Sequence, residues 1–141
     1  MARMVLLDAN MLIGAFDGDP DNNPVHAEAK RRMEELLLDP DVRLATSPLI
    51  RYETLRNVKR ISVADLEAIL NDFEQFDTRE KDARRSAEIY RLARDKGQKI
   101  DKRQFDVFHY VCAELNGLEF ESQDGDIPKI RQLLQSGNEN A

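Results

Sequence analysis

The chain has 141 residues, 41% of them hydrophobic, which is enough for one ordinary domain with a single core. It contains one cysteine, Cys112, and two histidines, His26 and His109, so an internal disulfide and the usual structural zinc sites are excluded. The net charge of -6 argues against a uniformly basic, nucleic-acid-binding surface.

Basic side chains nevertheless gather in three segments. Most of them fit solvated helix faces, and we expect only a minority to contact phosphate. The three groups are Arg51, Arg56, Lys59 and Arg60; Arg84, Arg85, Arg91 and Arg94; and Lys96, Lys99, Lys102 and Arg103.

Apolar runs are short throughout the sequence. None approaches the roughly 18 residues needed to cross a bilayer. The first ten residues, MARMVLLDAN, hold too short an apolar stretch for a signal peptide. We therefore expect a cytoplasmic protein that does not enter a membrane.

Apolar runs and capping residues predict strands that alternate with helices. Asn23 followed by Pro24, Ser47 followed by Pro48, and Ser62 are typical of helix starts. In chain order we expect a strand at 4–7, helices at 9–16 and 24–38, a strand at 42–46, helices at 48–58 and 63–71, a short strand at 73–78, helices at 80–96 and 102–116, a strand at 118–122 and a helix at 128–135.

Helical periodicity also predicts which side chains face the core. The helix at 48–58 would bury Leu49, Tyr52, Leu55 and Val58. The helix at 80–96 would bury Ala83, Ala87, Tyr90 and Ala93.

The alternation of strands and helices indicates an α/β protein with a parallel sheet covered on both faces. Such sheets bind ligands beyond the carboxyl ends of their strands. We expect one domain over residues 1–135 and a flexible tail over residues 136–141.

Four acidic residues are candidates for that edge. Asp8 and Asp124 each follow a predicted strand, where an aspartate is more often a helix cap or turn residue. Asp106 lies inside an otherwise apolar helix, where a lone carboxylate needs a donor, a cation or a metal. Glu53 lies at the margin of a buried stripe, where a solvated carboxylate is an ordinary alternative.

These four residues are more informative together than singly, because all four are expected at the same edge of the sheet. Carboxylates that share a pocket stay ionised only when cations compensate them. Oxygen ligands of this kind select Mg²⁺ or Mn²⁺. The sequence therefore predicts a metal centre built from Asp8, Glu53, Asp106 and Asp124.

Four segments contain the candidate residues, in this order: Leu6-Leu7-Asp8-Ala9-Asn10-Met11-Leu12, Arg51-Tyr52-Glu53 after Ser47-Pro48, Asp106-Val107-Phe108-His109-Tyr110-Val111, and Ser122-Gln123-Asp124-Gly125-Asp126. Together they resemble the PIN domain and, within it, the VapC-type toxins. The resemblance spans nearly the whole chain, and it includes the interval from Asp106 to Asp124. The last strand, with Glu119 and Glu121, is more acidic than the family pattern.

The resemblance implies a three-layer αβα PIN-like fold with a central, mainly parallel sheet of four or five strands. It implies an Mg²⁺- or Mn²⁺-dependent endoribonuclease that leaves a 5′-phosphate and a 3′-hydroxyl. Asp8, Glu53 and Asp106 would bind metal, Asp124 would complete the site, Asn10 would orient the first acid or the substrate, and Asp126 would assist. The implied partners are RNA, a small antitoxin and a second copy of the chain.

Other sequence patterns give weaker support for a function. The loop 17–22 with Glu28 partly imitates a calcium loop, but position six is Asn22 instead of glycine. A haloacid dehalogenase type phosphatase needs a second aspartate where Asn10 stands. We interpret both histidines and Cys112 as structural, and we retain a catalytically inactive PIN scaffold or a housekeeping RNA-processing nuclease as alternative functions.

Overall fold

The computed structural model describes residues 2–98 and 104–123. The predicted domain boundary at residue 135 and the predicted helix at 128–135 lie outside these residues. The elements are β1 (Arg3–Leu7), α1 (Ala9–Phe16), α2 (Pro24–Leu38), β2 (Val42–Thr46), α3 (Pro48–Arg56), α4 (Val63–Asn71), β3 (Glu74–Gln75), α5 (Glu80–Asp95), α6 (Gln104–Asn116) and β4 (Glu119–Glu121).

The described strands form one parallel sheet in the order β3-β2-β1-β4. β1 is an interior strand, and it pairs with β2 on one side and β4 on the other. All four carboxyl ends therefore point to the same edge of the sheet, as the sequence predicted.

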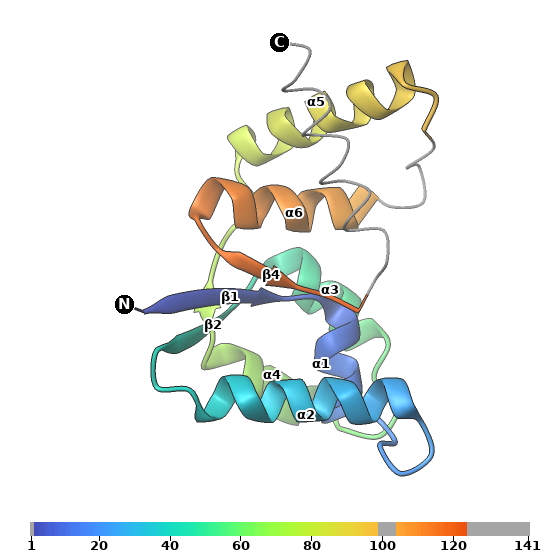
Figure 1. The fold of residues 1–141 in the computed structure, drawn as a ribbon, viewed down its shortest axis with the longest axis vertical. Helices are drawn as coiled ribbons and strands as arrows, with labels where there is room; N and C mark the ends of the chain where they lie inside the picture. The colour runs from blue at the N-terminus through green and yellow to red at the C-terminus, as the bar shows by residue number, and fades with distance from the viewer. Residues whose placement is uncertain (1, 99–103, 124–141) are drawn as a thin grey trace.

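Helices cover both faces of this sheet. In Figure 1, α5 and α6 lie above it, while α1, α2 and α4 lie below it. The main core cluster includes Leu6, Leu12, Met33 and Leu66, and a second cluster with Ile89 joins α5 to α6. The three-layer α/β arrangement is therefore confirmed. No helix in the described ranges is long and apolar enough to cross a membrane.

Local capping signals placed the helix starts correctly. The side chains of Asn23, Ser47 and Ser62 each accept a hydrogen bond from a backbone N–H of the helix that follows. Pro24 and Pro48 occupy first-turn positions where no donor is lost. These starts depend only on neighbouring residues.

The predicted core faces of two helices were wrong in part. Tyr52 is 52% exposed, although the periodicity of α3 placed it in the core. In α5 the buried face includes Asp82, Ser86 and Ile89, one position away from the predicted stripe. Asp82 can be buried there because Arg79 donates to it at 3.1 Å. β3 is also shorter than predicted, with only Glu74 and Gln75 in the ladder.

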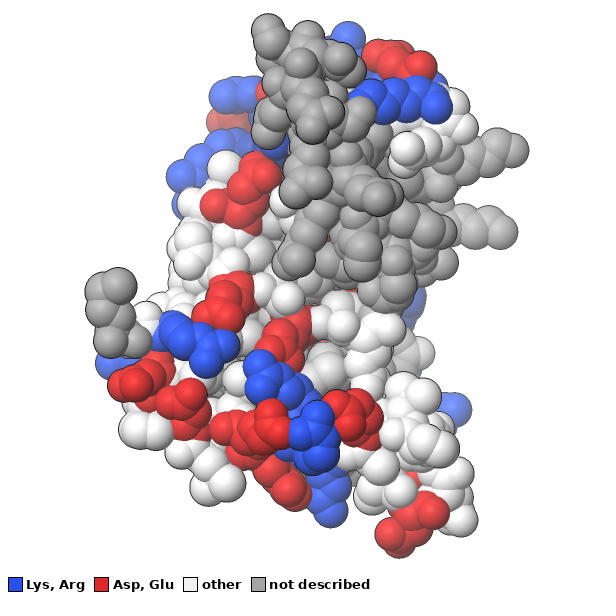
Figure 2. Space-filling view, in the orientation of Figure 1, with Lys and Arg blue, Asp and Glu red and all other residues white. Residues whose placement is uncertain are grey.

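Ion pairs account for the acidic last strand. Arg3 donates to Glu119 at 2.7 Å, and Arg32 of α2 donates to Glu121 at 2.9 Å. Arg32 also donates to Glu35 at 2.9 Å, and Figure 2 shows acidic and basic side chains interleaved over this part of the surface. The carboxylates of this strand are thus paired with arginines of β1 and α2.

Asp17 joins the end of α1 to the loop after α3. Its carboxylate accepts backbone N–H groups of Lys59 at 2.8 Å, Arg60 at 2.6 Å and Ile61 at 2.7 Å. Burial by itself would raise the pKa of Asp17, but these three N–H donors outweigh it and hold the pKa below its ordinary value. The ionised form of Asp17 therefore stabilises the fold.

We expect Asp17→Asn to lower the free energy of unfolding at neutral pH by about 2 kcal/mol, because hydrogen bonds to a charged acceptor are replaced by weaker ones. Since the folded pKa is depressed, the stabilisation is present above the ordinary aspartate pKa and is lost as pH falls through the folded pKa. Urea denaturation at neutral and acidic pH measures both effects. Asp21→Asn, at an exposed site in the same loop, is the control, and equal losses in both variants would contradict the assignment.

Candidate metal centre

Asp8 lies where the interior strand β1 ends and α1 begins. Its Oδ1 accepts the backbone N–H of Ala9 at 2.8 Å, and its Oδ2 accepts the hydroxyl of Ser122 at 2.7 Å. The residue is 4% exposed. The sequence predicted this position at the mouth of the sheet, and the structure adds that Asp8 caps α1.

Glu53 of α3 and His109 of α6 meet beside Asp8. His109 Nε2 forms a hydrogen bond with Glu53 Oε1 and lies 3.9 Å from Asp8 Oδ1. One ligand atom from each of the three residues lies within 4.8 Å of the other two. Residues that are distant in the sequence thus form one compact group of metal-ligating types.

Burial has the largest effect on the pKa of Asp8. It raises the pKa of Asp8, and the negative charge of Glu53 raises it further, while His109 and the donors from Ser122 and Ala9 act in the opposite direction. The net pKa is above the ordinary value. A cation near Asp8 would favour its ionised form, so this pair of carboxylates suits a divalent ion.

His109 is a functional candidate that the sequence interpretation missed. It is 1% exposed, as expected for a structural histidine, but its Nε2 faces the acidic pair instead of an apolar core. In metal sites, groups that hydrogen-bond a ligand fix its orientation. The available signal was the spacing from Asp106 to His109, which places both on one side of a helix.

Asn10 connects α1 to the segment that follows β4. Its Nδ2 donates to Ser122 Oγ at 3.2 Å, and its Oδ1 accepts the backbone N–H of Gln123 at 3.2 Å. Ser122 in turn donates to Asp8. Asn10 therefore contacts the first acidic residue through Ser122, whose part in the site the sequence did not predict.

The remaining predicted site residues are Asp106, Asp124 and Asp126. Asp106 is partly buried in the first described turn of α6, one turn before His109, and it is not in the group of three. Asp124 and Asp126 lie outside the described residues, so their role stays a prediction.

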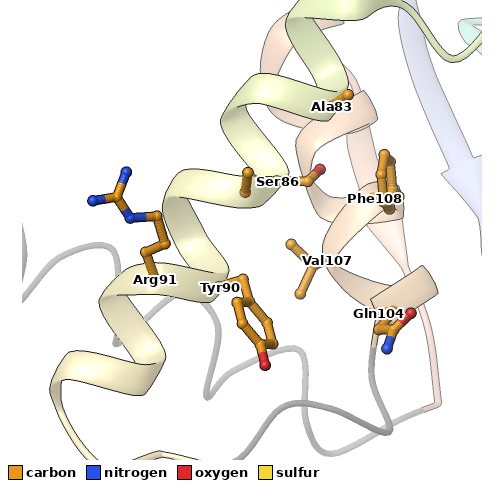
Figure 3. A pocket seen from close by; sticks show the side chains of 8 residues that line it. Ala83, Ser86, Tyr90, Arg91, Gln104, Val107 and Phe108 are labelled. Atoms are coloured by element: carbon orange, nitrogen blue, oxygen red, sulfur yellow. The ribbon is translucent and has the colours of Figure 1, made fainter.

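The cavity between α5 and α6 is a separate feature. Figure 3 shows it with side chains from both helices, and its volume is about 320 Å³. The lining includes Ala83, Tyr90, Val107 and Phe108, and none of the acidic candidates. This cavity therefore does not coincide with the group formed by Asp8, Glu53 and His109.

A model of the PIN domain matches residues 5–133 of the chain. This chain belongs to the PIN-domain family. The matched range contains all six predicted site residues, which are Asp8, Asn10, Glu53, Asp106, Asp124 and Asp126. No sequence match was found among curated proteins.

Solved structures of toxin proteins share the fold. A toxin-antitoxin complex from Klebsiella pneumoniae matches with a TM-score of 0.61 and 23% identity, over 85% of this chain and 86% of the other. VapBC-1 from nontypeable Haemophilus influenzae has a TM-score of 0.64 and 15% identity, with 92% of each chain covered. Mycobacterium tuberculosis VapC20, described as a Sarcin-Ricin loop cleaving toxin, has a TM-score of 0.62 and 15% identity, with 89% and 93% covered. At these identities the likeness establishes the PIN fold.

We expect Asp8→Asn to raise the melting temperature in a chelating buffer at neutral pH. The variant keeps a good capping residue and removes a buried charge that lies close to Glu53. Because the pKa of Asp8 is raised in the folded protein, ionising Asp8 destabilises the wild type as pH rises. In acid, where Asp8 is protonated, the melting temperatures of the two proteins should become equal. Thermal melts across pH measure this difference, and a variant that melts lower at neutral pH would show that burial of the charge is not the dominant effect.

Proposed function

We propose that this PIN domain is a metal-dependent endoribonuclease that hydrolyses RNA phosphodiester bonds. The observation that carries the proposal is the convergence of Asp8, Glu53 and His109 at the carboxyl edge of a parallel sheet. The family resemblance adds Asp106 and Asp124 as ligands, with Asn10 and Asp126 as orienting residues. We assign Mg²⁺ or Mn²⁺ to this site, because carboxylates are its main donors.

Each residue has a distinct part in this proposal. Asp8 and Glu53 bind the ion, and the hydrogen bond from His109 fixes the orientation of Glu53. Asn10 and Ser122 hold the Asp8 carboxylate at the end of β1. A bound divalent ion supplies a water of lowered pKa and neutralises charge on the leaving oxygen.

Partners follow from the structural neighbours. Two of the neighbours reported above, from Klebsiella pneumoniae and Haemophilus influenzae, are toxin-antitoxin or VapBC assemblies. We propose that this chain is the toxin of a type II toxin-antitoxin system, that a small antitoxin blocks its acidic edge, and that it forms a homodimer in the cytoplasm. An arginine of the antitoxin would pair with these carboxylates.

Cleavage of single-stranded RNA should require Mg²⁺ or Mn²⁺ and stop on chelation. Asp8→Asn and Asp106→Asn should each reduce the cleavage rate by about 100-fold or more, beyond the loss typical of residues that only support a metal ligand. A gel assay of a labelled RNA measures this. Asp65→Asn, an exposed carboxylate on α4, is the matched control.

Two results would reject this assignment. Full activity of highly pure protein in excess chelator would exclude metal dependence, and a cyclic-phosphate product would indicate a metal-free route. A folded wild-type protein that binds RNA but never cleaves it would instead indicate the inactive scaffold.

Induced expression of the wild-type chain should arrest bacterial growth, and co-expression of its antitoxin should relieve the arrest. Asp8→Asn, expressed at a matched level, should cause no arrest, because the toxicity depends on the metal centre. Growth curves and immunoblots measure both. Equal arrest by the two proteins would indicate binding or aggregation, and no arrest by either, together with cleavage in vitro, would favour a housekeeping nuclease.

A further inference from the structure

An exposed tyrosine lies beside the proposed metal centre. Tyr52 immediately precedes Glu53 in α3, and it is 52% exposed. Exposed apolar residues are common on protein surfaces, but this aromatic ring lies beside a proposed site, where it is accessible to a ligand. The inference that follows rests on the proposed nuclease function.

Two neighbours hold the Tyr52 ring. Phe105 of α6 meets it edge to face, with ring centroids 6.1 Å apart and planes at 84°. The Arg56 guanidinium carbon lies over the ring, 5.1 Å from its centroid, and Arg56 Nη1 donates to the Tyr52 hydroxyl at 3.4 Å. A ring held in this way loses little conformational freedom when a ligand binds.

The same two helices carry both this ring and the metal centre. Tyr52 and Glu53 are adjacent in α3, and their partners Phe105 and His109 are four residues apart in α6. Four residues correspond to about 6 Å along a helix. The ring therefore lies about one helical turn from the His109 contact.

Arg56 keeps its charge available for an anion. Among the residues that the structure describes, it forms no ion pair, whereas Arg31, Arg32 and Arg85 each contact carboxylates. A guanidinium has five N–H donors, so Arg56 can bind phosphate through the donors that do not contact Tyr52.

We propose that Tyr52 and Arg56 form a stacking platform for one unpaired base of the RNA substrate, next to the bond that is cut. Aromatic rings and arginine planes bind unpaired bases by stacking, and arginine adds an attraction for the backbone phosphate. A base inside a duplex cannot expose its face to this ring.

The test measures RNA binding separately from cleavage. In an Asp8→Asn background with Mg²⁺, a short single-stranded RNA containing 2-aminopurine is titrated with protein, and stacking quenches its fluorescence. We expect Tyr52→Ala to raise Kd roughly tenfold and to abolish the quenching, and Tyr52→Phe to stay within about twofold. Tyr90→Ala, at an exposed tyrosine of α5, is the matched control and should leave Kd unchanged.

Arg56→Ala provides a second readout. It should weaken binding and reduce the salt dependence of Kd by about one phosphate contact. Tyr52→Leu keeps an apolar side chain without a ring, so it separates the loss of stacking from the loss of packing. It replaces Tyr52→Ala if the alanine variant has a lowered melting temperature. Loss of quenching in Tyr52→Leu supports the platform.

The outcomes separate the two proposals. If wild type cleaves RNA but Tyr52→Ala and Tyr52→Leu bind it like the parent, the platform is rejected and the nuclease remains. The platform is also rejected if the substitutions weaken duplex and single-stranded RNA equally, or weaken only antitoxin binding. If wild type neither binds nor cleaves RNA, both proposals fail.

Discussion

The buried carboxylate of Asp8 is the constraint on which the rest of this structure depends. It ends the interior strand of the sheet, where burial disfavours its charge. The first N–H of α1, the Ser122 hydroxyl and the His109 imidazole all approach it from different elements. The relative placement of α1, α6 and the end of β4 is therefore coupled to the electrostatic requirements of one side chain.

Much of the fold could be predicted because its signals are local. A serine or asparagine before a proline fixes a helix start through neighbouring backbone groups, and short apolar runs indicate buried strands. Asp8 could be placed for the same reason, because the end of β1 is visible in the sequence. The parallel direction of the strands followed from the alternation of strands and helices, whereas the strand order β3-β2-β1-β4 was not predicted.

The features that escaped prediction are set by tertiary contacts. His109 looks like a core residue until Glu53 is placed opposite it, and these residues are 56 positions apart. Tyr52 fits a buried stripe by periodicity, yet it stays 52% exposed although Phe105 of α6 packs against it edge to face. Asp17 resembles a loop residue, although three backbone donors more than 40 positions away surround it. Periodicity reports one helix at a time and contains no information about what packs against it.

The pairing of the first and last described strands has a consequence for synthesis in the cell. β1 is made before β4 and Ser122, and the Ser122 to Asp8 hydrogen bond spans 114 positions. Chains emerge from the ribosome with their N-terminus first, so a nascent chain carries Asp8 and Glu53 before its partners in α6 and β4 exist. The centre can thus assemble only after α6 and β4 have been made, and a fragment that stops before them would lack the contacts of Asp8 with Ser122 and of Glu53 with His109.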